Sequence, residues 1–141
     1  MTEQETLEGN KLIAEFRNDK IILEEDGICI ISDSKMWFSG NKRLEQYQEK
    51  CYHSSWDWLM PVVEKIEKIH NDHHGYFGVY ISSNQCTIQG TKLNLALKNP
   101  EYGFVYLSDT NAIFDTKIKS TWFAVVEFIK WYTLNIKNNK K

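Results

Sequence analysis

The hydrophobic pattern near the C-terminal end of the chain predicts a helix with two apolar faces. At 100° per residue, one stripe of residues 118–136 carries Ile118, Trp122, Val125, Val126, Ile129, Tyr132 and Ile136. A second apolar set projects away from that stripe and comprises Phe123, Ala124, Phe128, Trp131 and Leu134. Either this helix packs between two layers of its own domain, or its second face contacts a partner.

A second stretch, residues 54–70, has the pattern of an amphipathic helix behind a serine cap. Its apolar side chains share one face at helical spacing and are Leu59, Val62, Val63, Ile66 and Ile69. Pro61 complicates the start of this helix, because proline lacks an N–H and clashes with the preceding turn. Either Asp57 or Trp58 caps the helix and Pro61 lies in its first turn, or the helix kinks at Pro61.

Shorter apolar runs predict two β-hairpins. The β-branched residues 21–23 and 28–31 flank a turn that ends in Gly27, and an Asp-Gly pair supplies the positive φ angles of a tight turn. In residues 76–81 the period changes to two, and residues 86–89 follow after a polar turn. Short connections of this kind favour antiparallel pairing in a meander.

The remaining segments are less regular. Residues 12–16 have the spacing of a short helix, and residues 104–107 predict a further strand. Residues 92–97 fit either a strand or a turn of helix, and residues 32–51 show no clear pattern.

Together these elements predict an α+β fold. We expect an antiparallel sheet of hairpins packed by two long amphipathic helices, at about 56–70 and 117–136, and by a short N-terminal helix. We expect residues 1–9 to be flexible, residues 10–137 to form a single α+β domain, and residues 138–141 to be a frayed basic tail.

Composition and charge narrow the class of protein. Hydrophobic residues make up 42% and charged residues 26% of the chain, which excludes a largely disordered protein. The net charge of -2 conceals an asymmetry, since residues 1–26 are acidic and residues 117–141 are basic. We interpret the basic end as a solvated terminus and expect no direct nucleic-acid contact. No apolar run of about 18 residues is present and the start is acidic, so we expect a cytoplasmic protein without a membrane segment.

The histidines and cysteines do not have the spacing of a metal site. Cys51 and His53 precede the second helix and His70 follows it, whereas 15 helical residues span roughly 22 Å. The loop from His70 to His74 would need a distant carboxylate to complete a site. We therefore expect no metal and no cofactor.

The chain also lacks the motifs of common catalytic sites. Ser54 and Ser55 lack the flanking glycines of a nucleophile elbow, and no phosphate-binding loop, dinucleotide fingerprint, zinc-protease motif or EF-hand loop is present. The three cysteines are odd in number and widely separated, so each is expected to be a buried free thiol. We expect a protein without catalytic residues.

Aromatic side chains remain as candidate contact residues. At 13% of the chain they are too many for one small core to enclose completely, and exposed aromatics often anchor interfaces. The candidate partner-binding residues are the anchors Trp131, Phe123 and Trp56 with the rim charges Glu127 and Lys130. The alternative is structural: Trp56 packs over the helix start and Trp131 covers a neighbouring loop.

Three segments of the chain, residues 10–16, 52–67 and 123–132, resemble a group of small phage and prophage proteins of Bacteroidetes-type bacteria. The most specific of them contains the string Trp56-Asp57-Trp58-Leu59-Met60-Pro61. The resemblance covers about a quarter of the chain, and the group has no established activity, so no residue role is carried over. The resemblance implies a setting, which is an accessory phage protein in the cytoplasm of an infected bacterial host cell.

These observations lead to one hypothesis and two alternatives. The hypothesis is a non-enzymatic phage-type accessory protein that binds a host protein, such as a nucleic-acid-bound defence effector, and inhibits it stoichiometrically as an anti-CRISPR protein does a CRISPR RNA-guided nuclease. The first alternative is a small metal-dependent hydrolase or nuclease that uses the loop from His70 to His74. The second is a homo-oligomeric structural protein. The pattern does not indicate an oligomeric state.

Overall fold

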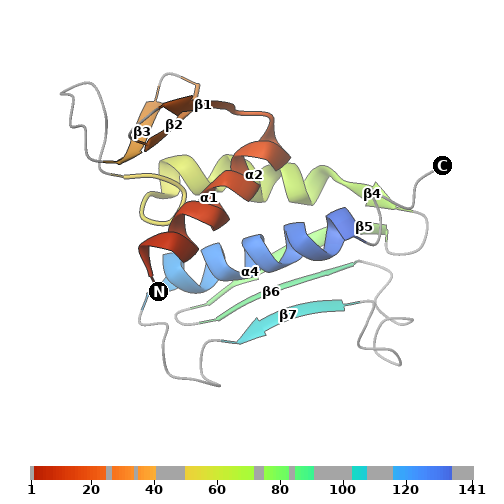
Figure 1. The fold of residues 1–141 in the computed structure, drawn as a ribbon. Helices are drawn as coiled ribbons and strands as arrows, with labels where there is room; N and C mark the ends of the chain where they lie inside the picture. Colours follow the sequence, from red (N-terminus) through yellow and green to blue (C-terminus); the bar gives the residue numbers. More distant parts are fainter. Residues whose placement is uncertain are drawn as a thin grey trace.

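The fold consists of three described helices and two antiparallel sheets, and the predicted α+β class is confirmed (Figure 1). The computed structural model describes residues 2–24, 27–33, 35–40, 50–71, 75–82, 85–90, 103–107 and 116–134. The first half of the chain forms α1 (Glu3–Arg17), β1 (Lys20–Glu24), β2 (Gly27–Ser32), β3 (Lys35–Gly40) and α2 (Trp56–Lys68). The second half forms β4 (His70–Asn71), β5 (Gly75–Ile81), β6 (Gln85–Gly90), β7 (Gly103–Leu107) and α4 (Lys117–Tyr132).

Both predicted hairpins are confirmed. Strands β1 and β2 pair antiparallel from Lys20↔Ile31 to Glu24↔Gly27, and β3 adds to β2 as the third strand of this sheet. No element was predicted where β3 lies. The second sheet has the order β4-β5-β6-β7, with Val79 of β5 opposite Ile88 of β6. The strand predicted at residues 104–107 is β7, whereas residues 92–97 lie outside the described residues.

Helix α1 begins at Glu3, well before the short helix that we predicted at residues 12–16, and so includes most of the segment that we expected to be flexible. Thr2 is the N-cap, and its Oγ1 accepts a hydrogen bond of 3.0 Å from the backbone N–H of Glu5. Two turns later, Gly9 is buried against Trp122 of α4. The cap and this contact hold the first turns, which have few apolar side chains of their own. The helix ends at Asn18, whose φ of 66° is the left-handed conformation typical of helix ends.

Helix α2 spans Trp56–Lys68, close to the predicted 56–70, but its cap differs from the predicted alternatives. Ser55 is the N-cap without a side-chain hydrogen bond, and Pro61 lies inside the helix beyond its first turn. A cap at Asp57 or Trp58 was therefore wrong. The proline ring removes the hydrogen bond that the carbonyl of Asp57 would otherwise accept. The apolar face is as predicted, because Leu59, Val62 and the neighbouring apolar residues of α2 are buried.

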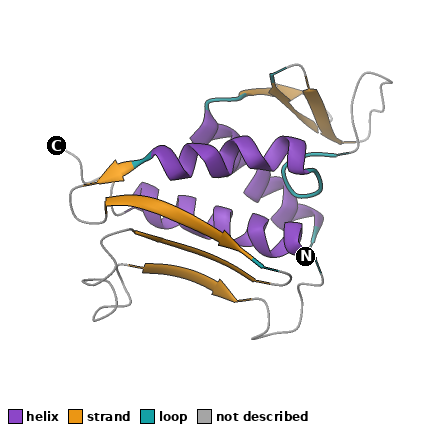
Figure 2. Cartoon of the chain, turned by 180° about the vertical axis from the view of Figure 1, so that it is seen from behind, coloured by secondary structure: helices purple, strands orange, loops and turns teal. Residues whose placement is uncertain are grey.

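Helix α4 packs between two layers of its own chain, which explains its two apolar faces. One face of α4 contacts α1, and the other contacts β6 and β7. Figure 2 shows the molecule from the side of the sheet that contains β5, β6 and β7. Phe128, with no exposed surface, packs its ring 5.0 Å from that of Phe77 on β5. Ala124 is also fully buried. The first of the two alternatives for this helix is thus correct for Ala124 and Phe128, while Leu134 at its end is 67% exposed.

No helix within the described segments is long and apolar enough to cross a lipid bilayer.

Candidate binding surface

A hollow between α1 and α4 brings together three of the predicted contact residues. Its volume is about 260 Å³. The buried or half-buried floor is formed by Gly9, Leu12, Trp122 and Val126. The more accessible rim, which we call the α1/α4 rim, is formed by Glu5, Glu8, Phe123, Glu127 and Lys130.

Helical spacing and one glycine create this hollow. Phe123, Glu127 and Lys130 recur at i, i+4 and i+7 and so lie on one stripe of α4. A Cβ atom on Gly9 would lie 2.2 Å from Cζ2 of Trp122, so only glycine permits the observed approach of the two helices. The close approach places the acidic first turns of α1 beside the stripe on α4.

The α1/α4 rim is predominantly acidic. Glu127 and Lys130 form an ion pair of 3.7 Å, with side chains 38% and 52% exposed, so this pair is mostly solvated. Glu5 and Glu8 add two carboxylates from α1, and Glu8 accepts a hydrogen bond of 2.8 Å from Gln4. An apolar floor below an acidic rim suits a lysine or arginine side chain, whose alkyl stem prefers apolar contact and whose head is charged.

The two predicted tryptophan anchors lie elsewhere. Trp131 is half-buried on the sheet side of α4, with its ring 6.0 Å from Phe77 and 5.9 Å from Phe128. Trp56 is 37% exposed at the start of α2. The predicted set is therefore divided between three places, and Trp131 belongs in part to the packing of α4 on the sheet.

Two exposed tyrosines on β5 were not among the predicted contact residues. Tyr76 and Tyr80 are 54% and 57% exposed. They alternate along the strand with Phe77, which packs on Phe128, so they project from the opposite face of the sheet. The period-two pattern of residues 76–81 contained the signal that could have identified them.

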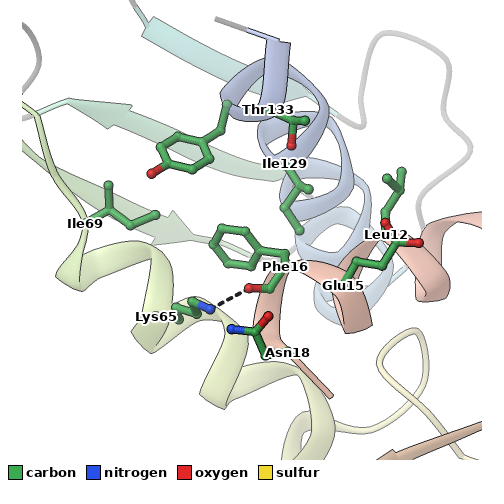
Figure 3. A pocket seen from close by; sticks show the side chains of 9 residues that line it. Leu12, Glu15, Phe16, Asn18, Lys65, Ile69, Ile129 and Thr133 are labelled. Carbon is green, nitrogen blue, oxygen red and sulfur yellow. Dashed lines mark hydrogen bonds between the residues drawn. The ribbon is translucent and has the colours of Figure 1, made fainter. Parts of the chain in front are cut away.

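A second hollow lies between α1, α2 and α4 (Figure 3). Its volume is about 350 Å³, and its walls are mainly apolar, with Phe16, Ile69 and Ile129 among them. Lys65 reaches in from α2, and its Nζ donates a hydrogen bond to the carbonyl oxygen of Phe16, drawn as a dashed line in Figure 3. The same ammonium lies 4.9 Å from the centre of the Phe16 ring. This lysine therefore ties α2 to the end of α1.

A polar cluster holds the segment before α2 against the N-terminal elements. The hydroxyl of Tyr52 donates to the carboxylate of Asp19, which also accepts a hydrogen bond of 2.7 Å from Arg17. Arg17 donates further hydrogen bonds to Ser32 and Asp33. Burial raises the pKa of Tyr52, and its hydrogen bond to Asp19 acts in the same direction. Sequence reasoning missed this cluster because its members come from separate segments.

The histidines that the structure describes do not converge. His53 is half-buried beside α1 and β3, and the ring of His70 on β4 packs 4.8 Å from that of Tyr76. His73 and His74 lie outside the described residues. Across the described parts of the chain, no group of three His, Cys, Asp or Glu residues is placed to hold a metal ion.

The cysteines are buried free thiols, as predicted. Burial raises the pKa of Cys86 to about 11 and raises that of Cys51 further. Both thiols are therefore protonated at neutral pH, which opposes a nucleophilic role.

No family model, curated protein or solved structure matches this chain.

Proposed function

We propose that this protein acts by binding another protein and that the α1/α4 rim contacts that partner. The observation that carries the proposal is that Phe123, Glu127 and Lys130, which are far from α1 in sequence, line one hollow with Glu5 and Glu8. An aromatic anchor flanked by solvated charges is a common composition for a protein interface, with the charges at its edge. The complementary group on the partner is a lysine or arginine side chain.

The partner we propose is a host defence effector whose nucleic-acid channel carries such basic side chains. A CRISPR RNA-guided nuclease is the leading candidate, because the resemblance to phage proteins indicates an infected cell as the setting. Acidic groups on a small protein attract a basic channel and accelerate association. Inhibition would then be stoichiometric, without turnover.

Affinity capture from infected host cells tests this proposal. We expect the wild-type chain to retain one host protein and the Phe123→Ala and Glu8→Lys variants to bind it about fivefold more weakly or worse, since truncating an interface aromatic or reversing a neighbouring charge costs about 1–3 kcal/mol. Glu67→Lys, on the exposed face of α2, is the matched control for the change in charge. Equal recovery of the host protein by all four chains would contradict the α1/α4 rim as the contact.

Solution mass distinguishes this proposal from self-association. We expect light scattering at micromolar concentration to give the 16.6 kDa of one chain. A stable dimer that Phe123→Ala dissociates would instead assign the hollow to a second copy of the chain.

A further inference from the structure

A buried asparagine connects α1 to α4 and to the segment before α2. Asn10 has no exposed surface, and its Oδ1 accepts a hydrogen bond of 2.9 Å from Nε1 of Trp122. On the other side, Nδ2 of Asn10 lies 3.0 Å from Nδ1 of His53. Trp122 and Asn10 are 112 residues apart in the sequence.

The chemistry of the three side chains determines where the proton on His53 lies. The indole N–H of Trp122 can only donate, so the Asn10 atom that faces it must be the amide oxygen. The amide NH₂ of Asn10 therefore faces His53 and donates to it. Nδ1 of His53 must then be an unprotonated acceptor, and the neutral ring carries its proton on Nε2.

We propose that His53, Asn10 and Trp122 form a pH-sensitive latch, the His53 latch, that fastens residues 50–55 to α1 and α4 while His53 is neutral. Protonation puts an N–H on Nδ1, so that two donors face each other. Asn10 cannot relieve this by rotating its amide, because its NH₂ would then face the N–H of Trp122. The hydrogen bond between His53 and Asn10 is lost, and the segment that leads into Ser55 and α2 loosens.

The surroundings of His53 favour its neutral form. Burial lowers the pKa of His53 below its ordinary value of 6.5. From β3, the indole of Trp37 packs 6.0 Å from the imidazole and carries no charge. A third hollow, between α1 and β3, is lined by both His53 and Glu3 of α1. Glu3 is exposed, so solvent screens its carboxylate. The flanking titratable residues of its own segment are Lys50, Cys51 and Tyr52, the last bonded to Asp19.

The sign of the pH dependence follows from the lowered pKa. Between the folded and unfolded values, the unfolded chain binds more protons at His53 than the folded chain does. The stability that the His53 latch contributes is thus present above about pH 6.5. It is lost as the pH falls through the folded-state pKa. The inference concerns the isolated chain and does not depend on the proposed function.

Nuclear magnetic resonance of the full chain tests the tautomer and the titration directly. We expect long-range ¹H–¹⁵N couplings to place the proton of neutral His53 on Nε2, and the ring to titrate below 6.5. We expect backbone amides of residues 51–59 to exchange about tenfold faster at pH 5 than at pH 7.5 after correction for intrinsic rates, as for the loss of one hydrogen bond. The His53 signals are assigned by their absence from His53→Gln.

Two variants separate the His53 latch from a purely structural contact. His53→Gln keeps a carbonyl acceptor at every pH, so its amides should not show the additional exchange at pH 5. Asn10→Asp turns the donor into a carboxylate that can accept from Trp122 and from protonated His53, so the pKa of His53 should rise above its wild-type value. A purely structural contact predicts the same effect of pH on amide exchange in wild type and in His53→Gln.

Three results would overturn the inference. They are a neutral His53 with its proton on Nδ1, a wild-type titration at or above that of a free histidine, and an equal effect of pH on amide exchange in wild type and His53→Gln. If Asn10→Asp does not fold, the measurements on wild type and His53→Gln still decide the question.

Discussion

Gly9 of α1 lies directly against Trp122 of α4, and a Cβ atom at Gly9 would come within 2.2 Å of Cζ2 of that indole. The indole is itself held by its hydrogen bond to Asn10 and is 2% exposed, so it has little freedom to move aside. The contact sets how closely the two helices approach and therefore the shape of the hollow between them.

We expect Gly9→Ala to lower the free energy of unfolding by about 1–3 kcal/mol, the range for overpacking a tight site. Urea unfolding monitored by tryptophan fluorescence measures the change. The matched control is Gly78→Ala on β5. There the nearest atom to an added Cβ, at 2.7 Å, is the hydroxyl oxygen of the exposed Tyr80, a side chain that can swing away. If Gly78→Ala lowers the free energy of unfolding as much as Gly9→Ala does, the contact with the Trp122 indole is not the cause of the destabilisation.

The position of α4 between α1 and the sheet predicts a large cost for removing Phe128. We expect Phe128→Ala to lower the free energy of unfolding by about 3–5 kcal/mol, the range for deleting a buried aromatic ring. Leu134→Ala, at a residue 67% exposed, should change it by less than about 0.5 kcal/mol. Similar, small effects of the two substitutions would show that the sheet does not cover this face in solution.

Trp131 and Phe123 lie on different sides of α4 and should therefore separate stability from binding. We expect Trp131→Ala to lower the free energy of unfolding by about 2–4 kcal/mol, because its ring packs near Phe77 and Phe128. Partner capture by the folded fraction should persist. Phe123→Ala should show the opposite balance, with weaker capture and a smaller loss of stability. Capture that depends on Trp131 and not on Phe123 would move the proposed contact to another face.

The hydrogen bond from Tyr52 to Asp19 predicts a pH dependence at the alkaline end. Because burial raises the pKa of Tyr52 above its ordinary value of 10.0, the stability that this hydroxyl contributes is present below pH 10 and is lost as the pH rises further. At pH 7 we expect Tyr52→Phe to cost about 1–3 kcal/mol, since the carboxylate of Asp19 loses a donor. Unfolding experiments at pH 7 and pH 10.5 measure both quantities. The difference between wild type and Tyr52→Phe should shrink at the higher pH, and a constant difference would be evidence against this role.

Much of the fold follows from local patterns. The β-branched runs of β1 and β2 and the alternation along β5 predicted the two hairpins, because strand patterns act over a few residues. The positive φ expected at Gly27 was wrong, since this glycine lies in β2 opposite Glu24 and is not among the described glycines with positive φ. The apolar face of α2 was predicted because helical spacing is also a local property of the sequence. The first turns of α1 and the strand β3 were missed, since a cap, a glycine contact and pairing with β2 stabilise them more than any apolar repeat of their own.

The candidate site was predictable only in part. Phe123, Glu127 and Lys130 were among the predicted contact residues, and in the structure all three line one hollow. Periodicity could not reveal that Glu5 and Glu8 of α1 lie beside that stripe, or that Trp131 turns toward the sheet. These outcomes depend on which elements pack against α4.

By itself, the sequence determined the kinds of elements and which of their faces are apolar, because backbone geometry imposes periods of 3.6 and 2.0 on any chain. It also showed that α4 has two apolar faces without showing what covers them. Only the tertiary structure decided that, since the answer depends on contacts between residues far apart in the chain. The hydrogen bond from Trp122 to Asn10, which spans 112 residues, depends on how whole elements pack and not on any local pattern.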